Sequence, residues 1–236
     1  MGDPRPFQPA TPATQPPLLY VPYAATVLRA PRQALVPMEH TLSEVTGPSV
    51  GRERLWEHSA DLSRSTAGAE AIGQRIVVSG RVCDTAGQPL RGMLLEIWQA
   101  NAAGRYRHVR DDHDAPLDPS FTGRGAVVTD DEGRYRFITI EPGAYPWGNH
   151  YNAWRPRHIH FSLFGPAFAT RLVTQMYFPG DPLLLLDPIF NSVPDAQARA
   201  RLICTLDMDT GVADVSLGYR FDIVLRGRAQ TALESA

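Results

Sequence analysis

Two histidines, His158 and His160, stand two residues apart in the stretch His-Ile-His-Phe-Ser-Leu-Phe. Aromatic and β-branched residues dominate this stretch, which favours a β-strand. Because successive side chains of a strand point to opposite faces, the two imidazoles project from the same face. Two imidazoles on one face can share a metal ion, and they can equally be structural residues of the strand.

The other candidate ligands near this pair are tyrosines. Cysteine and clustered Asp or Glu usually complete such sites, but residues 145–160 offer Tyr145, Tyr151 and Arg155, and Tyr106 lies upstream in Gly-Arg-Tyr-Arg-His. A phenol has an ordinary pKa near 10, so a phenolate at neutral pH requires a pKa shift of roughly three units, or about 4 kcal/mol. Only a strong Lewis acid achieves such a shift readily.

Phenolate is a hard oxygen donor that favours Fe(III) over Fe(II) or Zn(II). Two tyrosinates and one hydroxide would neutralise the ferric charge in a pocket of low dielectric and so reduce the desolvation penalty. The residues therefore allow a ferric site, without establishing one.

Composition excludes several other kinds of chemistry. All 23 basic residues are arginines, so there is no Schiff-base lysine, no lysine general base and no phosphate-binding loop that ends in Gly-Lys-Ser/Thr. The two cysteines, Cys83 and Cys204, lack metal-type spacing, which argues against a disulfide scaffold and a cysteine-rich zinc site. A reduced, cytoplasmic location fits this pattern best.

Charge and hydropathy indicate the kinds of partner. The net charge is -2 and like charges form no long run, so nothing predicts binding to nucleic acid or to an anionic membrane. The first residues lack the apolar core of a signal peptide, and the longest aliphatic run, 183–186, is too short to cross a bilayer. We expect small molecules and proteins as partners.

The chain divides into an arm, residues 1–74, and a domain, residues 75–236. Many of the 21 prolines fall near the start, where apolar and polar residues do not alternate. The clusters at 18–23 and 35–36 are too apolar to remain in water without a cost in free energy. We therefore expect an extended arm that wraps the domain or a neighbouring chain.

Beyond residue 75 the strand signals become regular, with turn signals at 84–89 and 130–133. The expected strands are 75–82, 93–98, 126–129, 135–140, 157–164, 172–177 and 218–225. Short strands separated by turns predict an all-β fold, an antiparallel two-sheet β-sandwich. A few short helices are expected, one of them at 194–203, where Ser192 and Pro194 give a start signal.

Several motifs follow one another in a fixed order along most of the chain. They are Arg29-Ala-Pro-Arg-Gln-Ala-Leu, Trp98-Gln-Ala-Asn, Gly104-Arg-Tyr-Arg-His, Ala115-Pro-Leu-Asp-Pro, Tyr145-Pro-Trp, Trp154-Arg-Pro-Arg-His-Ile-His-Phe and Tyr219-Arg-Phe-Asp-Ile-Val-Leu-Arg-Gly. In these motifs the chain resembles the intradiol ring-cleavage dioxygenases, and within them the branch that acts on protocatechuate. The segments 109–114 and 184–187 fit the motifs of this family less clearly.

The resemblance implies an oxidoreductase of aromatic catabolism. Its non-haem Fe(III) would use O2 to cleave protocatechuate (3,4-dihydroxybenzoate) to 3-carboxy-cis,cis-muconate in the β-ketoadipate pathway. By motif, one iron per chain would be held by Tyr106, Tyr145, His158 and His160, with hydroxide or water as a fifth ligand. Tyr145 and His160 would be axial, and the substrate would displace Tyr145, which makes this tyrosine both a ligand and a catalytic residue.

The resemblance also assigns residues to the substrate pocket. Arg155 matches the arginine that stabilises the carbanion-like form of the chelated substrate, because its guanidinium supplies a fixed positive charge. The pocket wall would comprise Tyr23, Trp147, Gln175, Tyr177 and Ile189. Tyr177 and Ile189 could equally be core residues, Trp98 is expected to pack nearby, and His108 is expected on the opposite face.

The protocatechuate branch pairs such a chain with a homologous α subunit, and the αβ protomers form higher oligomers. One alternative is an intradiol enzyme for catechol or hydroxyquinol, but those enzymes usually begin with a helical linker domain, whereas this arm is rich in proline. A second alternative is a non-catalytic β-sandwich binding module. Such a module would not need Tyr106, Tyr145, His158 and His160 together.

Overall fold

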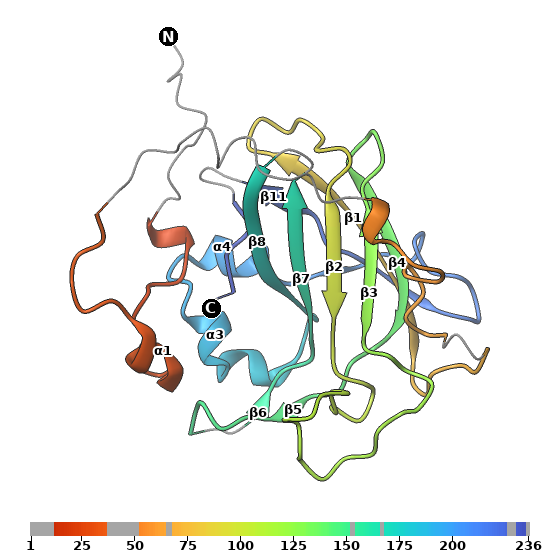
Figure 1. Cartoon of the computed structure of the whole chain (residues 1–236), viewed down its shortest axis with the longest axis horizontal. Helices are drawn as coiled ribbons and strands as arrows, with labels where there is room; N and C mark the ends of the chain where they lie inside the picture. Colours follow the sequence, from red (N-terminus) through yellow and green to blue (C-terminus); the bar gives the residue numbers. More distant parts are fainter. Residues whose placement is uncertain are drawn as a thin grey trace.

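The computed structural model describes residues 12–36, 52–64, 68–151, 154–165, 168–225 and 230–234. Two packed β-sheets form the body of the molecule (Figure 1). The first sheet has four antiparallel strands in the order β3 (Arg124–Val128), β2 (Leu94–Trp98), β7 (His158–Gly165) and β8 (Phe168–Tyr177). The predicted two-sheet sandwich is confirmed.

The second sheet is mixed. Its order is β11 (Ile223–Leu225), β1 (Arg75–Asp84), β10 (Leu217–Arg220) and β9 (Thr205–Leu206), and β4 (Arg134–Ile140) also pairs with β1. β1 runs antiparallel to β4 but parallel to β10 and β11. The expected strand 218–225 is therefore two strands, separated at Asp222, whose carboxylate accepts the backbone N–H of Arg81 at 2.9 Å.

The core lies between the sheets and is built by alternation along the strands. In β4, Tyr135 and Phe137 are buried, whereas Arg134 and Arg136 are exposed. Phe161 from β7 lies edge-on to Phe137, with 5.9 Å between the ring centres. Burying one such side chain contributes about 2 to 3 kcal/mol, so this alternation fixes the register of both sheets.

Short helices cover one side of the sandwich, next to β8 (Figure 1). They are η3 (Pro182–Leu185), α3 (Pro188–Asn191) and α4 (Ala196–Ala200). The helix expected at 194–203 is the single turn α4, because Leu202 already accepts the backbone N–H of Tyr177 at 2.8 Å. Tyr177, Leu184 and Phe190 form a second apolar cluster between these helices and β8.

The described part of the arm contains η1 (Pro12–Thr14), α1 (Ala24–Arg29) and η2 (Arg52–Arg54). Ala24 donates its backbone N–H to Asn149 at 3.1 Å, and Tyr23 is buried. The division of the chain between residues 74 and 75 stays a prediction. Among the described residues, no helix is long and apolar enough to cross a membrane.

Candidate metal centre

Four side chains converge where β7 begins, next to the two-stranded ribbon of β5 (Tyr145–Pro146) and β6 (Trp154–Arg155). The Nε2 atoms of His158 and His160 lie 3.2 Å apart. The Tyr106 hydroxyl lies 3.2 Å from His160 Nε2, and the Tyr145 hydroxyl lies 3.3 Å from His158 Nε2. The structure thus brings together the four residues that the sequence predicts as metal ligands.

Gly104 allows the two tyrosines to meet. It has φ +79°, and a Cβ at this position would lie 2.1 Å from the carbonyl oxygen of Ala144. Only glycine combines this conformation with so close a backbone approach. The loop that carries Tyr106 therefore packs directly on the segment that enters β5, and the rings of Tyr106 and Tyr145 meet edge to face with centres 5.3 Å apart.

Asp111 holds the backbone of Tyr106 in place. Its Oδ2 accepts the N–H of Tyr106 at 2.7 Å, and its Oδ1 lies 2.9 Å from His113 Nδ1. Burial opposes ionisation of Asp111, but the hydrogen bonds from the His113 side chain and from the backbone of Tyr106 and His113 together outweigh burial, so the pKa of this carboxyl is lowered. Both residues lie in the segment 109–114, whose role the sequence left open, and His113 carried no assignment.

Each metal-facing histidine is fixed from behind by its other ring nitrogen. His158 Nδ1 lies 2.7 Å from the carbonyl oxygen of Pro156, and His160 Nδ1 lies 2.9 Å from Glu234 Oε2. Both partners are hydrogen-bond acceptors, so each Nδ1 carries a hydrogen and donates it. Each Nε2 then keeps its lone pair toward the centre. Trp98 stacks on the His160 ring at 4.7 Å and 5°, which confirms that it packs at the site.

Burial sets the protonation of these donors. It raises the pKa of Tyr106 well above its usual value, the neighbouring Tyr145 adds to this effect, and burial also raises the pKa of Tyr145. Burial lowers the pKa of His158 well below its usual value, and the charge of Arg155 lowers it further. Without a cation, the site therefore presents two neutral phenols and an unprotonated imidazole.

Arg155 lies beside the four donors and is almost completely buried, at 2% exposure. Its Nη2 contacts Asp187 Oδ2 at 2.8 Å, Gln175 Oε1 at 2.7 Å and the Tyr177 hydroxyl at 3.2 Å. Its Nη1 lies 3.3 Å from His158 Nε2. Burial opposes the charge, but the carboxylate of Asp187 and the neighbouring Tyr177 and Tyr145 together outweigh burial and raise the pKa of Arg155 well above its usual value.

Asp187 is a buried partner of Arg155 that the sequence did not reveal. It is fully buried, and its Oδ1 also accepts the N–H of Ile189 at 3.2 Å, which caps α3. The pair Asp187-Pro188 is a helix-start signal, but it does not show that the same carboxylate reaches an arginine 32 residues earlier. Glu234 was missed for the same reason.

The residues predicted to line the pocket gather around Arg155. Trp147 lies under the guanidinium, 5.1 Å from its central carbon, and Tyr23 lies 5.1 Å from Trp147. Gln175 and Tyr177 hydrogen bond to Arg155, and Ile189 is buried beside Asp187 in α3. Their contact with a substrate stays a prediction.

The remaining histidines lie outside this cluster. His108 is exposed, and its Nδ1 accepts the backbone N–H of Arg110 at 3.1 Å. His150 lies against Tyr151, with 4.0 Å between the ring centres, and His40 lies outside the described residues. No three His, Cys, Asp or Glu side chains of the described chain form a metal site, so a four-donor centre requires the tyrosines.

Comparison with known proteins identifies the class to which this fold and this cluster belong. A family model described as "Dioxygenase" matches residues 45–227, and one described as "Protocatechuate 3,4-dioxygenase beta subunit N terminal" matches residues 7–41. The chain therefore belongs to the dioxygenase family, which makes it an oxidoreductase. The resemblance inferred from the motifs is confirmed.

Within this family, the chain is 57% identical to the protocatechuate 3,4-dioxygenase beta chain of Burkholderia cepacia, over 90% of each chain. It is 29% identical to the alpha chain of the Pseudomonas putida enzyme, over 82% of this chain and 95% of that one. The structure of hydroxyquinol 1,2-dioxygenase from Pseudomonas putida DLL-E4 superposes with a TM-score of 0.56 at 23% identity, over 88% of this chain and 72% of that one. This last likeness supports the fold alone.

Proposed function

We propose that this chain is the iron-bearing subunit of an intradiol dioxygenase that cleaves protocatechuate with O2 to 3-carboxy-cis,cis-muconate. The observation that carries the proposal is the convergence of Tyr106, Tyr145, His158 and His160, with the buried charge of Arg155 beside them. The identity of 57% with a beta chain whose name specifies protocatechuate supports the choice of substrate.

Non-haem Fe(III) fits this donor set. Two buried phenols offer hard oxygen donors, and two imidazoles present their lone pairs because both Nδ1 atoms are engaged elsewhere. The ion would be held by Tyr106, Tyr145, His158 and His160. When bound, it would act as a Lewis acid that lowers the pKa of both tyrosines and of the two hydroxyls of a catechol.

Tyr145 would serve as a proton acceptor. It lies in the two-residue strand β5, which pairs with β6 apart from the two main sheets, so a movement of Tyr145 would not disturb those sheets. Burial raises the pKa of its hydroxyl, and a released Tyr145 therefore becomes protonated. Its Oη can take the proton that one catechol hydroxyl loses on binding.

Arg155 would stabilise negative charge on the substrate ring. Four side chains contact its guanidinium, and its Nη1 lies 3.3 Å from His158 Nε2, at the edge of the donor cluster. A positive charge held in place before the reaction does not need to reorganise when charge develops. Trp147 and Tyr23 would exclude water from the same space.

The homologous α subunit is the proposed partner, in αβ protomers that form higher oligomers. The similarity to both an alpha and a beta chain supports this assignment. Exposed apolar side chains on the described arm and on the nearby ribbon also support it, namely Leu18, Val21, Leu28, Val36, Tyr151 and Trp154. Val21 and Tyr151 line one hollow, and exposed apolar groups that lie together are typical of a protein interface. The cytoplasmic location stays a prediction.

Removal of residues 1–30 tests the role of the arm. Because this change deletes Tyr23 and the exposed apolar residues of α1, we expect loss of assembly with the α subunit and loss of protocatechuate turnover. Size-exclusion chromatography of the co-expressed chains and oxygen uptake measure the two effects. A truncated chain that assembled and turned over normally would refute this role.

The main test uses the chain purified with its α subunit. We expect about one iron per β chain and a visible tyrosinate-to-iron band, which shifts when protocatechuate is added without O2. After O2 is admitted, one O2 should be consumed for each 3-carboxy-cis,cis-muconate formed, with catechol and hydroxyquinol as comparison substrates. A protein that stays colourless after reconstitution with Fe(III) would contradict the proposed iron site and favour the alternative of a non-catalytic binding module.

A further inference from the structure

The two histidines of the donor cluster are supported in different ways. His158 donates from Nδ1 to the carbonyl of Pro156, two residues earlier in the chain. His160 meets Glu234, which lies 74 residues later, at 2.9 Å. The orientation of His158 is therefore set locally, whereas that of His160 depends on a distant segment.

This distant segment, residues 230–234, lies along the edge strand β8. Glu234 donates its backbone N–H to Val173 at 2.7 Å, and the carbonyl of Ala232 accepts the hydroxyl of Thr174 at 2.7 Å. Ala232 is fully buried. In Figure 1 the last blue stretch of the chain lies next to β8 and the short helices. The segment is thus held on the same strand that pairs with β7.

The arm fixes the same segment from the other side. The backbone N–H of Leu233 donates to the side chain of Gln15 at 2.9 Å, and both are part of the described chain. One hydrogen bond from the arm and two with β8 therefore hold the backbone of residues 232–234, which carries the Glu234 side chain. This carboxylate has little freedom to move away from His160.

A carboxylate behind a ligating histidine has two effects. It keeps the proton on Nδ1, which leaves the Nε2 lone pair facing the metal, and it makes the imidazole a stronger donor. A carbonyl such as that of Pro156 fixes the proton equally well but carries no charge. The two histidines therefore offer a metal unequal donors, and His160 is the stronger one.

We propose that Glu234 is a positioning residue for His160, and that through it the segment 230–234 governs how tightly the centre retains Fe(III). This inference rests on the proposed function, because it requires that the centre binds iron. It adds to the four donors a residue and a segment that do not contact the metal.

Iron retention tests the inference. We would replace Glu234 by glutamine, which keeps an acceptor oxygen but no charge, and by alanine, which removes both, in the chain purified with its α subunit. The measured quantity is the rate at which an excess of a ferric chelator removes iron at neutral pH. We expect removal to be about 10- to 100-fold faster for Glu234→Ala, and an intermediate increase for Glu234→Gln.

Two variants serve as matched controls. Leu233→Ala alters the neighbouring side chain but keeps the backbone bond to Gln15, and Glu96→Gln makes the same chemical change on β2. Both should lose iron at the rate of the unmodified protein. The melting temperature of each iron-free variant is measured as well, since a positioning role leaves it unchanged.

Three outcomes are distinct. Faster iron loss from both Glu234 variants, with unchanged melting of the iron-free protein, supports the inference. Iron loss at the unmodified rate, or faster loss only where the iron-free protein also melts lower, overturns it. If the unmodified protein itself takes up no Fe(III), the proposed function fails, and this result is seen before any variant is compared.

Discussion

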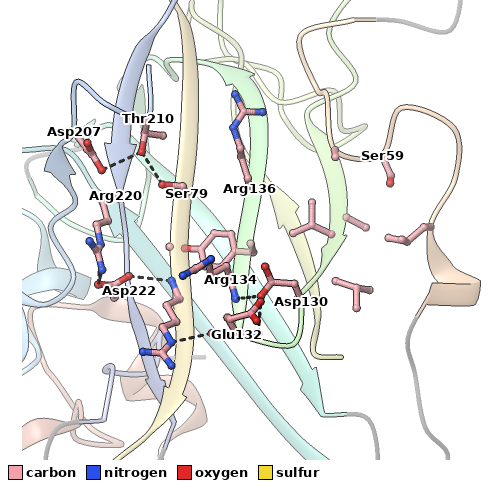
Figure 2. A pocket seen from close by; sticks show the side chains of 18 residues that line it. Ser59, Ser79, Asp130, Glu132, Arg134, Arg136, Asp207, Thr210, Arg220 and Asp222 are labelled. Carbon is pink, nitrogen blue, oxygen red and sulfur yellow. Dashed lines mark hydrogen bonds and ion pairs between the residues drawn. The ribbon is translucent and has the colours of Figure 1, made fainter. Parts of the chain in front are cut away.

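A broad groove and the candidate metal centre are built on opposite principles. The groove, of about 880 Å³, is lined by residues of β1, β3, β4 and β10, and Figure 2 shows its side chains. Its charged lining consists of Arg81, Arg134, Arg136, Arg220, Asp130, Glu132, Asp207 and Asp222. These groups are accessible to water, as the Arg220–Asp222 pair illustrates with 55% and 44% side-chain exposure.

The candidate metal centre instead contains buried polar groups. Arg155 and Asp187 form an ion pair at 2.8 Å with side-chain exposures of 2% and 0%. An exposed pair contributes about 0.2 to 1 kcal/mol, whereas breaking a buried pair costs about 3 to 5 kcal/mol. Buried polar groups that depend on one another therefore indicate a functional site better than the volume of a hollow does.

The largest expected difference in stability between the two regions concerns Asp187. Replacing Asp187 by alanine leaves the charge of Arg155 buried without its carboxylate, so we expect the free energy of unfolding to fall by about 3 to 5 kcal/mol. In the groove, Arg220→Gln removes a solvated partner of Asp222 and should change the free energy of unfolding by about 1 kcal/mol or less. Urea unfolding of the iron-free protein measures both. Equal losses would contradict the distinction.

Arg155 and Arg136 make a matched pair for activity. Changing Arg155 to glutamine removes the fixed charge beside the donors, and we expect kcat to fall about 100- to 1,000-fold, equivalent to about 3 to 4 kcal/mol. Arg136→Gln, in the groove, should leave kcat unchanged. Steady-state oxygen uptake with protocatechuate is the measurement. A groove variant with an equal loss of kcat would place chemistry on that face.

Substitutions at Gly104 and Gly87 distinguish the effect of steric crowding from that of backbone strain. Both have φ +79°, but a Cβ at Gly104 would lie 2.1 Å from Ala144, whereas nothing lies within 4 Å at Gly87. Alanine at Gly87 should cost about 1 kcal/mol of stability. Alanine at Gly104 should cost more and should also displace Tyr106, so that iron content falls. Thermal unfolding and iron analysis compare them, and similar values would refute a special role for Gly104.

The smallest effect concerns pH. Burial lowers the pKa of His158 below its unfolded value of 6.5, so below that pH the unfolded chain binds a proton that the folded chain excludes. This stabilisation is present above pH 6.5 and is lost as the pH falls toward the folded pKa, by up to about 1.4 kcal/mol per pH unit. Urea unfolding of the iron-free protein across this range should show the slope, and His158→Asn should reduce it.

The sequence predicts well what depends on neighbours along the chain. The two-residue period of β7 places His158 and His160 on one face, and the alternation in β4 buries Tyr135 and Phe137. The parallel pairing of β1 with β10 and β11 could not be read from the sequence, because strand direction depends on how the chain crosses the molecule.

The sequence could not predict the residues that support the candidate centre, for a related reason. Asp187 resembles a helix cap, Asp111 an exposed loop residue and Glu234 part of a polar tail. Each acquires its role only through a tertiary contact, with Arg155, the backbone of Tyr106 and His160 respectively. The motif resemblance supplied the four candidate ligands, whereas the packing around them is seen only in the structure.

The bond between Gln15 and Leu233 spans 218 positions of the chain. Contacts between residues so far apart in the sequence form late, because a long loop must close before they stabilise the fold. His160 should therefore acquire its final support only in the last stage of folding. Local opening of the native protein should follow the same order in reverse, so the amide hydrogens of Leu233 and Glu234 should exchange with solvent before those of β2 and β7.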